Sequence, residues 1–204
     1  MDYFSGDWHL GHANILKFDK RNFKNIDEMD QYLVRMAVNT LKSGDNFYYV
    51  GDWALCPRPK AEGYLASIAA TGANLFFIKG NHDKKDNISL FKQYGTFLGE
   101  KKTMKIWHEG TEHVLVLDHF ANRVWDRSHH GSYHLYGHSH DGLDKFGEEW
   151  GKSMDCGVMS ALRIKGDYSL FSFAEIHAIL DKRKIKVIDH HGLKERGYEG
   201  SSHK

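Results

Sequence analysis

Short apolar runs rich in β-forming residues alternate with amphipathic stretches through the first half of the chain. The runs cover residues 1–5, 47–50 and 75–78. Between them, apolar side chains recur at helical spacing over 26–41 and over 61–70. The resulting order of strand, helix, strand, helix, strand predicts a parallel sheet with right-handed crossovers.

The second half of the chain has a different pattern, with more strands that follow each other closely. A capping-box sequence from Ser172 to Glu175 predicts the start of a helix that runs to about Leu180, and 88–94 predicts another short helix. A hairpin-like turn is expected to join the strands 101–107 and 113–117. The expected strands are 101–107, 113–117, 133–136, 153–158 and an edge strand over 184–188.

The composition is that of an ordinary globular protein. The chain has 204 residues, of which 41% are hydrophobic and 27% charged, enough for one full core. We expect a single domain over 1–190 and a polar tail over 191–204. The net charge of +1 does not call for a nucleic-acid partner, and no apolar run approaches the roughly 20 residues of a membrane span.

Two further features concern the compartment and the chemistry. The sequence opens on a strand without a basic-then-apolar leader, and Cys56 and Cys156 lie far apart, so we expect a cytoplasmic protein. Histidine is abundant, with fifteen residues, which directs attention to metal ligands.

Residue types that bind metals follow the apolar runs at the points where strands should end. Because the strand ends of an open α/β sheet gather at one edge, we expect these side chains to share a site. They are Asp7 and His9, Asp52, Asn81, His138 and His140, and His119 after the run 114–117.

The spacing of these residues suits two divalent ions. Asp7 and His9, at i and i+2, would point to the same side of an extended chain. Asp52 offers two oxygens, one for each ion. Two ions about 3.5–4 Å apart polarise a phosphoryl group and hold a hydroxide for in-line attack. We expect Mn²⁺, with Fe, Zn²⁺ and Ni²⁺ as alternatives that also suit nitrogen and oxygen ligands.

Each cluster by itself also has a simpler interpretation. A Gly-Asp step after a strand is often a turn, and the sequence 81–83 is typical of a turn or a helix cap. His138 and His140 alone would be ordinary surface residues. The conjunction favours a shared site, because together the clusters provide a complete ligand set for two ions.

The motifs Asp7-Trp8-His9, Gly51-Asp52, Gly80-Asn81-His82-Asp83 and Gly137-His138-Ser139-His140 resemble the signature of the calcineurin-like metallophosphoesterases. The resemblance spans residues 3–158. Within that superfamily, the segments 7–15 and 153–158 look like those of the small single-domain phosphoesterases of bacteria and their phages. The resemblance implies an α/β fold, a four-layer αββα sandwich of two mixed β-sheets flanked by helices.

The resemblance also implies a role for each ligand. Asp52 would bridge the two ions. The first ion would be held by Asp7, His9 and His140, and the second by Asn81, His119 and His138.

The remaining roles concern the substrate. By the same resemblance, a bridging hydroxide would attack the phosphorus, and His82 would protonate the leaving oxygen or stabilise the transition state. Asp83 would orient the His82 imidazole. His12 and Asn14 would face the substrate. Arg123 either contributes a phosphate contact or lies on a solvated face, and the solvated face is favoured.

One segment departs from the family pattern. Ser or Gly usually precedes the histidine there and proline often follows, whereas this chain reads Leu117-Asp118-His119-Phe120-Ala121. We prefer His119 because it directly follows an apolar strand. The competing histidines are His113, His129, His130 and His134.

Two tryptophans stand where the family often has smaller side chains. Trp8 and Trp53 either pack beneath the metals or form a wall that stacks on a base, and packing is favoured.

The function that we expect is hydrolysis of a phosphodiester, in a small or cyclic nucleotide or a nucleic acid. A phosphomonoesterase is the first alternative. The second is a scaffold that keeps the fold and the metals without catalysis, and it is disfavoured because no ligand has been lost. An amide-cleaving zinc hydrolase is also disfavoured, because the Asn-His-Asp cluster matches phosphoester chemistry.

Overall fold

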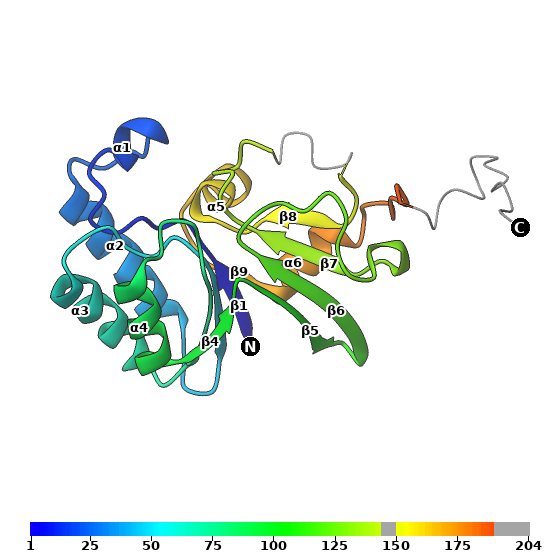
Figure 1. The fold of residues 1–204 in the computed structure, drawn as a ribbon, viewed down its shortest axis with the longest axis horizontal. Coiled ribbons are helices and arrows are strands. Elements are labelled where there is room, and N and C mark those ends of the chain that lie inside the picture. The colour runs from blue at the N-terminus through cyan, green and yellow to red at the C-terminus, as the bar shows by residue number, and fades with distance from the viewer. Residues whose placement is uncertain (144–149, 190–204) are drawn as a thin grey trace, which may run out of the picture.

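Two mixed β-sheets pack face to face in this computed structural model, which describes residues 1–143 and 150–189 (Figure 1). Within these residues the first sheet has the strand order β4-β3-β2-β1-β9. Its neighbours are parallel except for the antiparallel pair β1 and β9. Its strands are β1 (Asp2–Ser5), β2 (Asn46–Val50), β3 (Asn74–Ile78), β4 (Thr96–Gly99) and β9 (Phe171–Ser172).

The second sheet has the strand order β5-β6-β7-β8 in the same part of the chain. β5 and β6 form an antiparallel hairpin, whereas β7 is parallel to both β6 and β8. The expected α/β sandwich with two mixed sheets is therefore confirmed. The strands are β5 (Lys101–His108), β6 (Thr111–Asp118), β7 (Tyr133–Tyr136) and β8 (Ser153–Asp155).

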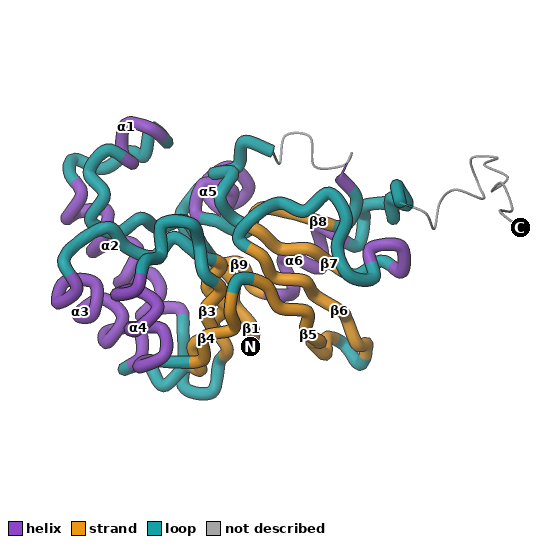
Figure 2. The backbone as a smooth tube through the Cα atoms, viewed as in Figure 1, coloured by secondary structure: helices purple, strands orange, loops and turns teal. Residues whose placement is uncertain are grey.

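Helices α2, α3 and α4 gather on the outer side of the first sheet (Figure 2). The Asn25 side chain caps α2 by accepting a hydrogen bond from the Glu28 N–H at 2.9 Å. Ser172 and Glu175 form the predicted capping box at the start of α6. The helices are α1 (Ile15–Phe18), α2 (Ile26–Thr40), α3 (Arg58–Ala69), α4 (Lys85–Tyr94), α5 (Val158–Lys165) and α6 (Phe173–Leu180).

Two hydrophobic clusters hold these layers together. One lies between the first sheet and its helices and includes Leu33 of α2 and Phe91 of α4, whose ring stacks on that of Phe77. The other lies between the two sheets and includes Phe4 of β1 and Leu115 of β6. Helix α6 also contributes to the second cluster, through Phe173, Ile176 and Leu180.

The segment 120–132 lies over the opposite face of the second sheet. The ring of Trp125 stacks on that of His134, with centroids 5.3 Å apart. The Asn122 N–H donates to His134 Nε2 at 3.0 Å, so the proton of His134 is on Nδ1 and is donated to Val116 O at 3.0 Å. His134 is thus a buried structural residue, held on both ring nitrogens.

Some element predictions are wrong. Residues 184–188 do not form a strand, and the strand expected over 153–158 ends at Asp155, with α5 starting at Val158. The short elements α1, β4, α5 and β9, and a 3-10 turn over Ser128–His130, were not predicted from the sequence. The tail expected over 191–204 lies outside the described residues. Within the described ranges, no helix is both long and apolar enough to span a bilayer.

Candidate metal centre

The loops that follow β1 and β2 run side by side at the carboxyl edge of the first sheet. Main-chain hydrogen bonds run from Asp7 N to Gly51 O at 3.0 Å and from His9 N to Asp52 O at 3.1 Å. The parallel alignment of the strands therefore continues past their ends and brings the three expected ligands together.

Five of the expected ligands have a backbone φ in the left-handed region. Such a φ is uncommon for residues other than glycine and costs about 1–3 kcal/mol, so it persists only where the surroundings impose it. The expectation of an extended Asp7–His9 segment is wrong, because β1 ends at Ser5 and a loop presents both side chains. The φ values are 58° at Asp7, 52° at His9, 62° at Asp52, 62° at His138 and 45° at His140.

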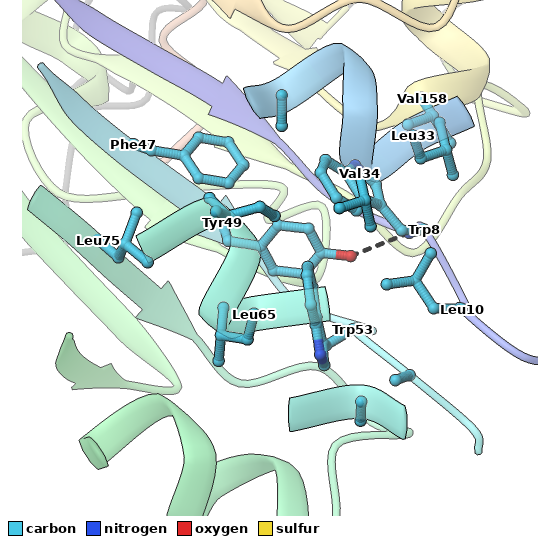
Figure 3. Packing of buried hydrophobic residues seen from close by; sticks show 14 of the residues in the cluster. Trp8, Leu10, Leu33, Val34, Phe47, Tyr49, Trp53, Leu65, Leu75 and Val158 are labelled. Carbon is cyan, nitrogen blue, oxygen red and sulfur yellow. Dashed lines mark hydrogen bonds between the residues drawn. The ribbon is translucent and has the colours of Figure 1, made fainter. Parts of the chain in front are cut away.

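Tyr49 links the loops that follow β1 and β2 through its side chain. Its hydroxyl accepts a hydrogen bond from the Trp8 N–H at 2.9 Å (Figure 3). The same hydroxyl donates a hydrogen bond to Asp52 O at 3.0 Å. Trp8 and Trp53 are fully buried, with ring centroids 5.5 and 5.2 Å from that of Tyr49. The preferred interpretation of the two tryptophans as packing residues is confirmed.

The first ligand group consists of Asp7, His9 and His140, each with one ligand atom within 4.8 Å of the others. His9 Nε2 and His140 Nε2 are 3.1 Å apart, and His140 Nε2 is 3.9 Å from Asp7 Oδ1. Among the described residues, Asp7 Oδ2 is buried without a hydrogen-bond partner. A buried, unpaired carboxylate oxygen beside two imidazoles fits a divalent cation.

The second ligand group consists of Asp52, His119 and His138. The Asn81 carbonyl oxygen completes it, at 2.9 Å from both His119 Nε2 and His138 Nδ1. Asp52 and His119 are buried, whereas Asn81 and His138 are exposed. This group is therefore accessible from solvent.

Asp52 joins the two groups through a single oxygen. Its Oδ2 lies 3.5 Å from His9 Nε2 and 3.3 Å from His119 Nε2. Its Oδ1 accepts a hydrogen bond from the His82 N–H at 2.8 Å. The expectation of one oxygen for each ion therefore stays a prediction, while in this structure Oδ2 faces both groups and Oδ1 is held by the main chain.

Glycines provide the room that the ligands occupy. A Cβ at Gly137 or Gly157 would lie 2.8 or 2.7 Å from Asp7 Oδ2. Gly51 has a φ of 90°, and a Cβ there would lie 2.5 Å from His119 Nδ1. Any larger residue at these positions would displace a ligand.

Burial dominates the electrostatics of the first group. It raises the pKa of Asp7 to about 7, with a further rise from the Asp155 carboxylate. Burial also lowers the pKa of His9 to about 3, which keeps the imidazole neutral. A cation between these residues would favour the ionised carboxylate and the neutral imidazole, and these are the forms that bind metals.

The second group contains a coupled pair. Burial lowers the pKa of His119, but the hydrogen bond with Asp52 and the charge of Asp7 outweigh it and raise the pKa to about 9. Burial raises the pKa of Asp52, but His119 and the His82 N–H together bring it below its usual value. A metal ion here would replace the proton on His119, so binding should release that proton.

Asp19 and Arg21 support the first group and were missed by the sequence analysis. His140 Nδ1 donates to the Asp19 carboxylate at 2.8 Å, which leaves Nε2 for a metal. Arg21 is buried and donates to Asp19 Oδ2 at 2.7 Å, to Asp7 O at 2.7 Å and to Trp8 O at 2.9 Å. The loop that carries them has no periodic pattern that would have indicated these contacts.

Asp155 supports the loop that carries His138 and His140. This buried carboxylate accepts hydrogen bonds from Ser139 Oγ at 2.7 Å and from Asp141 N at 2.9 Å. A signal for it was available, because Asp155 follows an apolar strand residue just as the ligands do.

Asp83 has a different role from the expected one. Its hydrogen bonds brace the Asp52 loop, and within the described residues none joins it to the His82 imidazole. The expectation that Asp83 orients His82 is therefore wrong. The carboxylate accepts hydrogen bonds at 2.8–3.0 Å from the main-chain N–H groups of Asp52, Trp53 and Gly80.

The rings of His82 and His12 both lie close to that of His9. The ring centroid of His82 is 5.4 Å from that of His9, and the His12 centroid is 6.1 Å away. His82 is exposed, and His12 is half-buried. Asn14 is exposed at the start of α1. The roles of His12 and Asn14 toward a substrate remain predictions.

The other candidates lie apart from the two ligand groups. Arg123 lines a separate hollow of about 220 Å³ with Tyr136 and Trp150. The competing histidines are in neither group, because His119 occupies the expected position beside Asn81.

Comparisons with known proteins give the fold without an activity. No family model matches the chain. The chain is 29% identical over 133 residues to an uncharacterized protein of Methanocaldococcus jannaschii, a match that covers 65% of this chain and 70% of that protein. It is also similar to the crystal structure of a protein of unknown function from Aquifex aeolicus, with a TM-score of 0.64 and 21% identity over 88% of this chain and 98% of that one.

Proposed function

We propose that this protein is a metal-dependent phosphoesterase that hydrolyses a phosphodiester, with a nucleotide or nucleic acid as substrate. The observation that carries the proposal is the position of Asp52 Oδ2, between His9 Nε2 of one ligand group and His119 Nε2 of the other. One buried carboxylate oxygen shared by two sets of nitrogen and oxygen ligands suits a pair of divalent ions. Mn²⁺ is the ion that we propose, with Fe, Zn²⁺ and Ni²⁺ as alternatives.

Each of the two ligand groups would hold one ion. Asp7, His9 and His140 would hold one ion, and Asn81, His119 and His138 the other, with Asp52 shared. Two such ions would supply Lewis-acid activation of the phosphoryl group and of the attacking water.

His82 is the residue that we propose as the general acid for the leaving group. Its main-chain N–H holds Asp52 Oδ1, while its exposed side chain stands beside His9 and outside both ligand groups. We infer that this imidazole donates a proton to the leaving oxygen. Its alignment must come from the substrate or from its own backbone, since Asp83 binds elsewhere.

A hollow beside the second group offers room for the organic part of a phosphoester substrate. This hollow of about 650 Å³ adjoins the exposed second group and includes Asn81 in its lining. An organic substituent of either ester type fits this space, so the preference for the diester is tested by comparing the two p-nitrophenyl substrates.

The test is hydrolysis of bis-p-nitrophenyl phosphate and of p-nitrophenyl phosphate by metal-stripped protein to which Mn²⁺ is added back. We expect metal-dependent cleavage of the diester, absent in an Asp52→Asn control. Cleavage of the monoester alone would replace the proposal with a phosphatase. No cleavage of either, with two ions bound per chain, would favour the scaffold.

We also propose that the protein acts in the cytoplasm. Cys56 and Cys156 form no disulfide, which suits a reducing compartment. Fractionation of the source cells would test this.

A further inference from the structure

A hollow of about 650 Å³ opens directly beside the second ligand group. Its lining joins the ligand Asn81 to Phe120, the residue that follows the ligand His119. A substrate whose phosphate lies between the two ligand groups would therefore extend part of its body into this hollow.

Phe120 presents an aromatic ring to this space. The residue is 48% exposed, although a phenylalanine beside a core strand usually buries its ring. The ring centroid lies 4.5 Å from that of His138 and 5.3 Å from that of His119. These contacts with two ligands hold the ring at the rim of the site, where it can meet a planar group.

The charges in the hollow argue against a second phosphate as its occupant. Lys79 Nζ pairs with Glu100 at 2.7 Å, and Lys101 Nζ lies 3.7 Å from Asp118 Oδ2. Each cation is thus matched by a carboxylate. A neutral ring with polar edges fits such a surface better than an anion.

We propose that Phe120 is the stacking platform for the nucleobase of a nucleotide-type substrate, and so a specificity-determining residue. Base-on-aromatic stacking tolerates any base, because every base has a π-face. This inference rests on the proposed function for the position of the phosphate. It assigns to Phe120 the stacking role that the buried Trp8 and Trp53 do not fill.

The experiment compares the binding of adenosine 5′-monophosphate and ribose 5-phosphate to the Mn²⁺-loaded protein by calorimetry. The two ligands share the phosphate and the ribose and differ in the base. Chromatography afterwards checks that each ligand is intact. We expect the nucleotide to bind about tenfold more tightly, as stacking of one base allows.

Three variants make the comparison specific. Phe120→Ala should remove the difference between the two ligands, and Phe120→Tyr should keep it. Trp107→Ala removes another exposed aromatic, at the far end of β5, and should change nothing. Metal content, measured for each variant, should stay at the native value, because Phe120 provides no ligand atom.

The outcomes separate the two proposals. Equal affinities in the native protein, or a difference that persists in Phe120→Ala, would overturn the stacking platform even if diester hydrolysis is observed. Tighter nucleotide binding that depends on Phe120, in a protein that cleaves neither p-nitrophenyl ester, would support the platform and reject the phosphoesterase.

Discussion

The two ligand groups of the candidate centre are built in different ways. In the first, Asp7 and His9 are buried, and His140 is tied to the Asp19 carboxylate, which Arg21 in turn holds. In the second, His138 and Asn81 are exposed. The outer partner there is a main-chain carbonyl, because His119 Nδ1 lies 2.9 Å from Val50 O.

This difference predicts that the two groups would bind their ions with different affinities. A buried set of ligands with a charged outer partner is held in place before an ion arrives, so it should bind more tightly. The exposed group faces the hollow at Phe120 and should exchange its ion and meet the substrate. The shared Asp52 couples the two groups, and the predictions below address that coupling first.

The largest effect is expected from Asp52→Asn. The change removes the charge that both groups share, so metal content should fall below two ions per chain. Activity should fall by about 1000-fold or more. Atomic emission spectroscopy and turnover of bis-p-nitrophenyl phosphate provide the readout. Full activity with two ions retained would contradict the shared role.

His82→Ala should have the next largest effect. Because His82 belongs to neither group, both ions should remain while kcat falls by roughly 100-fold or more, as for loss of a general acid. The same two measurements apply. Loss of an ion in this variant would mean that His82 is a ligand and that the division into two groups is incomplete.

Asp19→Asn tests the asymmetry directly. Loss of the charge behind His140 should weaken the first ion by roughly 10- to 100-fold and leave the second unchanged. Titration with Mn²⁺ against a chelator measures both affinities. Asp27→Asn is the matched control, since it removes an exposed carboxylate on α2. If the two variants behave alike, Asp19 does not support the first group.

The smallest effect on activity is expected from His134, a buried histidine outside both groups. Its effect is on stability. Burial lowers the pKa of His134 to about 4, whereas an unfolded histidine titrates near 6.5. Its contribution to stability is therefore complete above pH 6.5 and is lost as the pH falls toward 4. The free energy of unfolding should drop by on the order of 3 kcal/mol over that window.

Denaturant unfolding at several pH values, with metals chelated, measures this contribution. His134→Gln should be less stable at neutral pH and should lose less stability on acidification than the native protein. Identical pH profiles would assign the acid sensitivity to other groups. A loss of metal from the variant would mean that His134 affects the centre after all.

Much of the candidate site could be predicted from the sequence because its signal is local. An apolar run marks each strand, and a residue such as Asp52 or His119 follows directly after it. Parallel pairing then places the ends of β1, β2 and β3 at one edge. The strand ends, the candidate ligands and the α/β class therefore followed from the sequence alone.

The rest depended on contacts that no local pattern encodes. Asp83 is three residues past Gly80, but its carboxylate binds the loop 30 residues earlier in the chain. Asp19 meets His140 across 121 residues. The left-handed φ of His9 and the position of Asp52 Oδ2 between the two groups arise from the packing of these loops against each other.

The sequence by itself determined which residues are candidate metal ligands, because strand periodicity and residue type are properties of a few neighbouring positions. Only the tertiary structure decided how those residues are supported and which aromatic ring is exposed beside them. Trp8 and Phe120 show the reason. Both are aromatic and adjoin ligands, yet the core covers Trp8 and leaves Phe120 at the surface, and burial is a property of the whole fold.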